Sequence, residues 1–178
     1  MTARPAVRDV TLSRRSLLAL GLLLPVAGCS LLKKDPPLAK EIEIKKPADG
    51  AKIDFLATAS PLVNPGRDGV PSPISVRLYI LSSPDLFTEA NFFELWEKDE
   101  ATLGATLLGK KELFMTPSDV QRISAPLAPD ALAVGVTVGF EEFQKAKWRA
   151  IIPLQGEKTL KIRAKIDSES VTLGPQDD

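Results

Sequence analysis

The first 30 residues carry the most distinctive chemistry of this sequence, which is that of protein export. Four arginines and a single aspartate precede the apolar run Leu17–Leu24, and small residues then lead to Cys29, the only cysteine in the sequence. The run is too short to cross a bilayer as a stable helix, which needs roughly 20 apolar residues. Charged residues, Lys33 and Lys34, follow soon after it. We therefore interpret residues 1–28 as a signal peptide.

The residues just before Cys29, in Val26-Ala27-Gly28-Cys29, resemble the lipobox of bacterial lipoproteins. The resemblance implies that the Cys29 thiol receives a diacylglycerol, that cleavage falls before it and that the freed amine is acylated. Because each buried methylene contributes about 0.8 kcal/mol, two chains give lasting attachment. Ser30 is not the aspartate that retains such proteins in the inner membrane, so an outer-membrane lipid anchor facing the periplasm is implied. The pair Arg14-Arg15 leaves general and twin-arginine export both open.

The composition removes several kinds of enzyme from consideration. The sequence has no histidine and one cysteine, which excludes Ser-His-Asp and Cys-His catalysis, histidine-ligated zinc and a disulfide within the chain. Carboxylate-pair hydrolysis and Ser-Lys catalysis stay open on residue types alone. The sequence has no phosphate-binding loop, dinucleotide-binding glycine pattern or calcium loop. We therefore expect no enzyme activity, no cofactor, no metal and no small-molecule substrate.

The length left after export predicts one domain. Removal of residues 1–28 leaves 150 residues with 19 basic and 22 acidic side chains, a net charge of −3. That length is typical of a single core, and the charge predicts no nucleic-acid partner, because phosphate binding needs a concentrated basic surface. The predicted parts are a signal peptide (1–28), a lipidated N-terminus and tether (29–50), a β-sandwich domain (51–168) and a flexible C-terminal tail (169–178).

Alternating apolar residues predict a mainly β fold. Ile74–Leu81 alternates most clearly, and the β-branched stretch Ala133–Phe140 predicts a central strand whose glycines let a bulky group approach closely. A hairpin is expected around Thr116–Asp119. Parallel α/β folds need a helix after nearly every strand, so we predict a sandwich of two antiparallel sheets. The predicted strands are 52–60, 74–81, 110–115, 120–127, 133–140, 148–154 and 159–167.

The stretch after the second predicted strand favours a single helix. Ser82-Ser83-Pro84-Asp85 supplies a helix start, and aromatic residues recur at helical spacing over about residues 86–98. Such an apolar stripe usually packs on a sheet. A ligand pocket beside Phe92, Phe93 and Trp96 is the alternative, and it belongs to a second hypothesis in which the protein is a periplasmic lipoprotein that binds a small apolar ligand.

The segment between the first two predicted strands is expected to be a stiff, exposed loop. It runs from Pro61 to Pro73 and contains four prolines and two glycines in thirteen residues. Proline fixes φ and has no N–H donor, so this segment cannot lie in a central strand. Stiff exposed loops lose less entropy on binding, which makes them suitable for recognition.

An ordered set of short motifs resembles the outer-membrane lipoprotein of the type VI secretion system, the TssJ (VasD) family. The resemblance spans roughly residues 53–154, and the pair Glu141-Glu142 departs from an Arg-Asp pair of that family. The motifs are Asn64-Pro65, Gly69-Val70-Pro71-Ser72-Pro73, Val76-Arg77-Leu78-Tyr79, Phe92-Phe93-Glu94-Leu95-Trp96, Leu103-Gly104 and Ala146-Lys147-Trp148-Arg149.

This resemblance implies a transthyretin-like β-sandwich with one inserted helix after the second core strand. It implies a structural role in the secretion envelope complex, in which the protein recruits the periplasmic C-terminal region of the inner-membrane protein TssM through the loop 61–73. Asn64 is alternatively a turn-forming residue, since Asn-Pro favours turns. The candidate partner-binding residues are Asn64, Pro65, Gly66, Arg67, Asp68, Gly69 and Pro71.

Overall fold

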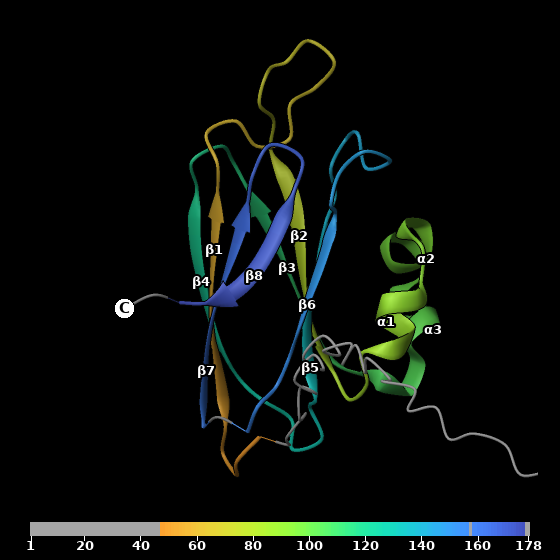
Figure 1. Ribbon diagram of the computed structural model, residues 1–178, viewed down its shortest axis with the longest axis vertical. Helices are drawn as coiled ribbons and strands as arrows, with labels where there is room; N and C mark the ends of the chain where they lie inside the picture. Colours follow the sequence, from red (N-terminus) through yellow and green to blue (C-terminus); the bar gives the residue numbers. More distant parts are fainter. Residues whose placement is uncertain (1–46, 157, 177–178) are drawn as a thin grey trace, which may run out of the picture. The chain divides into compact units, whose positions relative to one another are not determined.

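Eight strands form two four-stranded sheets in the part of the chain that the computed structural model describes, residues 47–156 and 158–176 (Figure 1). One sheet has the strand order β4-β1-β7-β8 and the other β3-β2-β5-β6. The predicted mainly β sandwich is confirmed. The signal peptide, Cys29 and most of the tether lie outside the described residues. The strands are β1 (Lys52–Ala59), β2 (Ile74–Leu81), β3 (Leu107–Met115), β4 (Val120–Pro126), β5 (Ala133–Val138), β6 (Arg149–Pro153), β7 (Thr159–Ile166) and β8 (Val171–Pro175).

Side-chain alternation decides which face of each strand meets the other sheet. In β1, Ile53, Phe55 and Ala57 are fully buried, whereas Lys52 at its start is exposed. In β2 both faces are largely buried, because one faces the other sheet and the other lies under helices. The β2 sheet is therefore covered on both sides.

The glycines of the central strand β5 make room for aromatic rings, as predicted. A Cβ atom placed on Gly135 would lie 2.7 Å from the Phe87 ring, and one placed on Gly139, just after β5, would lie 2.5 Å from the Trp96 ring. Both distances are shorter than real Cβ contacts. The rings of the helical segment thus rest directly on the β5 backbone.

The predicted single helix is wrong, because the segment forms three short helices. Ala90 is extended, with φ −60° and ψ 145°, and ends the first helix. Asn91 then starts the second with a capping box, in which its side chain accepts from the N–H of Glu94 and the Glu94 carboxylate accepts from the N–H of Asn91. We call these helices together the helical insert. They are α1 (Asp85–Glu89), α2 (Phe92–Glu97) and α3 (Asp99–Leu103), followed by a 3-10 turn at Gly104–Thr106.

A buried polar network fixes the helical insert on the sheet. Tyr79 on β2 donates its hydroxyl to Asp99 Oδ2 at 2.9 Å, and Lys110 Nζ on β3 lies 3.0 Å from the same oxygen. Arg77 Nη1 lies 3.8 Å from Asp99 and donates to the Trp96 carbonyl at 2.6 Å. The charge of the buried carboxylate is therefore balanced by two cations, as buried charges require.

This network shifts the pKa values of its members. Burial alone would raise the pKa of the Asp99 carboxyl, but hydrogen bonds from Lys110 and Tyr79 outweigh burial, so that pKa lies below its usual range. Burial is also the largest cause that raises the pKa of Tyr79, to about 12.

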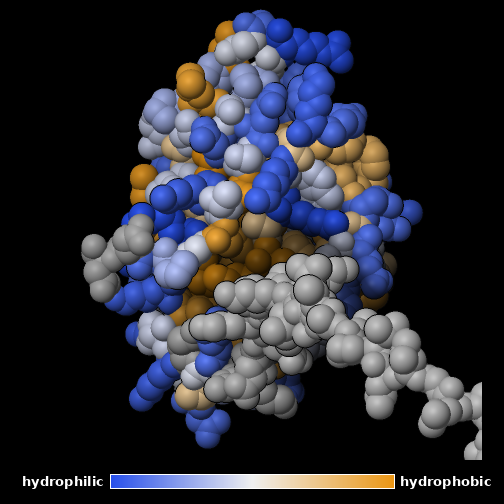
Figure 2. All heavy atoms as spheres, in the orientation of Figure 1, coloured by the Kyte–Doolittle hydropathy of each residue, from blue (hydrophilic) through white to orange (hydrophobic). Residues whose placement is uncertain are grey.

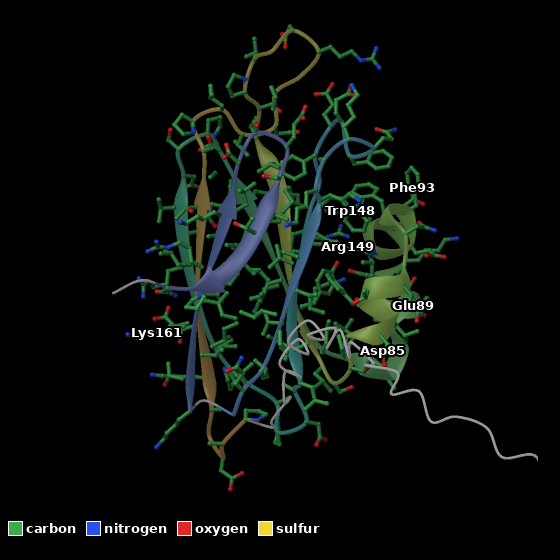
Figure 3. All side chains as sticks on the ribbon, viewed as in Figure 1. Asp85, Glu89, Phe93, Trp148, Arg149 and Lys161 are labelled. Atoms are coloured by element: carbon green, nitrogen blue, oxygen red, sulfur yellow. The ribbon has the colours of Figure 1, made fainter. Side chains whose placement is uncertain are left out.

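Arg149 and its neighbour Trp148 hold the helices from the β6 side. The Arg149 guanidinium donates to the carbonyls of Phe87 and Ala90 at the end of α1, a favourable place for a cation. The Trp148 ring meets Phe92 edge to face at a centroid distance of 5.1 Å. Figure 3 shows both side chains between β6 and the helices.

The connection between β3 and β4 is not the predicted hairpin. β3 pairs with β2 and β4 pairs with β1, so residues 116–119 carry the chain from one sheet to the other. One pair in the sandwich, β1 with β7, is parallel. Local alternation does not distinguish a hairpin from such a crossing, because each strand buries an apolar face in either arrangement.

The predicted flexible tail is also wrong over most of its length. Residues 171–175 form β8, which pairs with β7, and Val171 is fully buried. The sequence signal was weak because only Val171 and Leu173 alternate there.

Candidate partner-binding site

The loop 61–73 projects beyond one end of the sheets (Figure 1). Pro65 and Pro71 form an isolated antiparallel bridge that closes the loop. Within it, the Gly66 N–H donates to the Val70 carbonyl at 3.0 Å, and the Gly69 N–H donates to the Gly66 carbonyl at 2.8 Å. Gly69 has φ +76°, a backbone conformation that favours glycine. Residues 65–71 thus form a short hairpin that its own backbone hydrogen bonds hold together.

Asn64 fastens the base of this hairpin. Its side chain is buried, with 7% of the residue exposed, and its φ is +49°. The amide nitrogen donates to Ser72 Oγ at 2.8 Å and to the Pro73 carbonyl at 3.1 Å, while the amide oxygen accepts from the Glu141 N–H at 2.8 Å. The structure therefore places Asn64 beneath the loop, where its side chain positions other residues.

The tip of the hairpin presents a cation, an anion and apolar groups to solvent. The Arg67 side chain is 90% exposed. Asp68 is exposed as well, and its Oδ1 accepts from the Val70 N–H at 3.1 Å. Val70 and, at the start of the loop, Leu62 are exposed apolar residues. Such a mixture suits protein recognition better than catalysis, because it combines apolar area with charges that select a partner.

A second segment, the turn 139–148 between β5 and β6, lies against the hairpin. Glu142 Oε1 is 3.9 Å from Arg67 Nε, and Lys145 Nζ is 3.3 Å from Glu142. Sequence reasoning did not select this turn as functional, although the pair Glu141-Glu142 departs from the family that the sequence resembles. The hairpin and the turn enclose an open hollow of about 500 Å³. Its lining is Gly66, Arg67, Asp68, Val70, Pro71, Ser72 and Glu141.

Backbone hydrogen bonds join two other loops of this end to the chain just before the hairpin. The Ser118 N–H donates to the Ser60 carbonyl at 3.4 Å, and the Asn64 N–H donates to the Ser168 carbonyl at 3.0 Å. Four connections between strands therefore meet at one end of the sandwich and support the projecting loop.

The aromatic residues of α2 pack on other rings. Phe92 stacks on Trp96 at 5.5 Å and on Phe143 at 4.2 Å. Phe93 was predicted to pack on the sheet with the rest of the apolar stripe, but 53% of it is exposed. We call Phe92, Phe93, Trp96, Phe143 and Trp148 the aromatic cluster.

An apolar hollow of about 360 Å³ lies elsewhere, between the edge strands β3 and β4. Ile53, Leu78 and Ile80 form its inner wall, and residues 108–111 and 125–128 form its sides. Its size is within the usual range of small-ligand sites.

Within residues 47–156 and 158–176, no three or more carboxylate or cysteine side chains gather as a metal site would require. The helices described there are all too short or too polar to span a membrane.

A family model described as type VI secretion lipoprotein, VasD, EvfM, TssJ matches residues 51–169. A sequence search of curated proteins found no match.

Solved structures share the fold. The crystal structure of the type VI secretion lipoprotein TssJ1 from Pseudomonas aeruginosa matches with a TM-score of 0.69 and 22% identity, over 72% of this chain and 98% of that one. Serratia marcescens Lip, a membrane-bound component of the type VI secretion system, matches with a TM-score of 0.67 and 23% identity, over 72% and 99%. A chain in a structure described as the TssM C-terminal domain from EAEC matches with a TM-score of 0.60 and 21% identity, over 70% and 98%.

Proposed function

Because this chain belongs to the type VI secretion lipoprotein family of VasD, EvfM and TssJ, we propose that it recruits a TssM-like inner-membrane protein to the outer membrane. In this proposal, lipid on Cys29 anchors the protein to the outer membrane and the sandwich domain faces the periplasm. The loop 61–73 then contacts the periplasmic C-terminal domain of the partner. The role is structural, and no reaction is involved.

The observation that carries the proposal is that the loop 61–73 has a buried, hydrogen-bonded base and an exposed, charged tip. Its buried base, through Asn64, is bonded to Ser72, Pro73 and the turn 139–148. Its tip, with Arg67 and Asp68, is exposed. A surface that is already ordered before binding loses little entropy when a partner docks.

The family description and one solved structure support the choice of partner. The family is named for type VI secretion lipoproteins, and the structure described as the TssM C-terminal domain contains a chain of this fold. The lipobox-like Val26-Ala27-Gly28-Cys29 supports the anchor. Double acylation there would give lasting attachment.

Calorimetry tests the recruitment. The mature lipidated chain, purified in detergent, is titrated with the periplasmic C-terminal domain of the TssM-like protein from the same organism. We expect saturable one-to-one binding. The loop variant, Arg67→Glu with Asp68→Lys, is expected to lose it. An absence of binding at tens of micromolar, with the circular dichroism of a folded sandwich, would contradict the proposal.

A separate experiment tests the anchor. Cys29→Ala is expected to shift the protein from the outer-membrane fraction of a density gradient, and to remove the mass of the acyl chains from the intact mature protein. A wild-type mass without acyl chains, together with unchanged fractionation of the variant, would show that Cys29 is not lipidated.

The apolar hollow between β3 and β4 favours a second candidate function, the binding of a small apolar ligand. Ile80→Arg at its wall is expected to block such a ligand. A fluorescent fatty acid titrated into the wild-type protein measures this directly. Saturable binding that Ile80→Arg abolishes would favour the carrier function, and no binding would remove it.

A further inference from the structure

We propose that the partner-binding surface continues from the loop 61–73, across the turn 139–148, onto the outward side of α2, with Phe93 as its central contact. This inference rests on the proposed function and extends it, since it adds a second contact region for the same partner domain. It also specifies the chemistry of the partner, which is an apolar socket bordered by basic side chains.

The Phe93 ring is exposed but held in place. It meets Phe143 edge to face at 5.1 Å and 77°, and meets Phe92 at 5.7 Å and 81°. Phe92 is itself clamped by Phe143 and Trp148. An immobilised ring with 53% of its residue in water combines unused apolar area with low entropy loss, which is the profile of an interface hot spot.

Two consecutive residues make the surface continuous. Glu142 lies beside Arg67 of the loop 61–73, and the next residue, Phe143, lies against Phe92 and Phe93 of α2. The same turn is also bonded to Asn64 through the Glu141 N–H. A partner domain that covers the loop tip is therefore adjacent to the Phe93 ring.

The helical insert that carries Phe93 exposes mostly acidic side chains, with Lys98 as a cation next to Glu97. Asp85, Glu89, Glu94 and Glu97 of the helical insert are all exposed. In Figure 3, Phe93 lies at the upper end of the helices, Asp85 at the lower end and Glu89 between them. Figure 2 shows an apolar area at the upper right with hydrophilic atoms around it. An acidic border attracts a basic partner surface and speeds its association.

Phe93→Ala tests the contact in the mature lipidated chain in detergent, with the same partner domain. We expect the dissociation constant to rise at least about tenfold, as for a hot-spot aromatic residue, with an unchanged thermal midpoint. Phe93→Leu, which keeps apolar area, is expected to lose less affinity and serves if the alanine variant is unstable.

Phe114 is the matched control. It is also an exposed phenylalanine, 74% accessible, but it lies on β3 at the opposite edge of the sheet from β6. Phe114→Ala is expected to bind the partner normally. A loss as large as that of Phe93→Ala would overturn the assignment of the contact to α2.

The association rate with the partner domain tests the acidic residues of the helical insert. Glu89→Lys with Glu97→Lys is expected to slow association several-fold at low salt and much less at high salt. Asp49→Lys, at an exposed site near the start of the sandwich, is expected to change the rate little. Equal rates for both variants would overturn the basic character of the socket.

The outcomes separate the two proposals. Wild-type binding that is lost in the loop variant but kept in Phe93→Ala overturns this extension and leaves the proposed function intact. Failure of the wild-type protein to bind overturns both.

Discussion

The loop 61–73 and the helical insert are both additions to the sandwich, but they are held in different ways. The helical insert is fixed by buried ionic bonds and by rings resting on glycines, at Asp99, Gly135 and Gly139. The loop depends on the single buried amide of Asn64 and on short backbone bonds. Replacements at the buried contacts of the helical insert should therefore lower the free energy of unfolding, whereas replacements at the loop tip should change only binding.

The largest effect is expected at Gly135. Gly135→Val adds a side chain at a position where the Cβ atom alone would lie 2.7 Å from the buried Phe87 ring. We expect a loss of about 3 kcal/mol in the free energy of unfolding, as for an overpacked core. Urea denaturation measures it. Gly174→Val is the control, because a Cβ there meets nothing within 4 Å, and equal losses in both variants would refute the close approach.

Asp99 comes next. Asp99→Asn removes the buried carboxylate that Lys110 and Arg77 share, although Lys110 keeps Glu100 and Arg77 keeps Glu112. We expect a loss of about 2 kcal/mol in the free energy of unfolding. The same network predicts a pH dependence. Because the folded pKa of Asp99 is lowered, its stabilisation is complete above the unfolded pKa, about 4, and is lost as the pH falls through the folded pKa. Wild type and Asp99→Asn should therefore converge in stability at acid pH.

The alkaline side of this network has a direct optical readout. Tyr79 is the only tyrosine in the sequence, so tyrosinate absorbance reports its titration alone. We expect the Tyr79 hydroxyl to titrate near pH 12 in the folded protein, because burial raises the pKa of Tyr79 to about 12. Its stabilising contribution is complete below the unfolded pKa of about 10 and is lost between pH 10 and 12. Titration near pH 10 in the folded protein would contradict the buried contact.

A smaller effect is expected at the base of the loop. Asn64→Ala removes three hydrogen bonds and leaves the Glu141 N–H without its partner. We expect a loss of about 1 kcal/mol in the free energy of unfolding. Partner affinity should fall as well, because the loop is no longer held. Normal affinity with lowered stability would show that loop order is not needed for binding.

The smallest effect on stability is expected at the tip. The loop variant, Arg67→Glu with Asp68→Lys, changes exposed side chains whose surroundings are mostly water. Its free energy of unfolding should stay within about 0.5 kcal/mol of the wild-type value. A larger change, measured by the same urea titration, would mean that the tip contributes to the stability of the fold. It would contradict the expectation that the helical insert, and not the tip, supports stability.

Patterns of short range predicted much of this fold. The alternation of Ile74–Leu81 predicted a strand, and the glycines and β-branched residues of Ala133–Phe140 predicted a central strand that bulky groups approach closely, because these features depend on neighbouring residues. The crossing at 116–119 and the parallel β1/β7 pair were missed, because they depend on where distant strands find their partners. The break at Ala90 was missed even though Asn91 and Glu94 form a capping box that is legible in the sequence.

The candidate site was predicted only in part. The prolines located the loop 61–73, but not the burial of Asn64, whose partners are 8, 9 and 77 residues away. The turn 139–148 was not selected, because its position beside the hairpin follows from the paths of β5 and β6. Phe93 was expected to pack on the sheet, whereas 53% of it is exposed.

Mapping of the partner on the protein by NMR tests the central claim most directly. The mature chain, isotope-labelled and in detergent, is titrated with the periplasmic C-terminal domain of the TssM-like protein. We predict that the largest amide shift changes fall on residues 66–70 and 140–147 at one end of the sandwich. Changes confined to the outer face of β7, around Lys161, or no changes at saturating partner, would contradict the account.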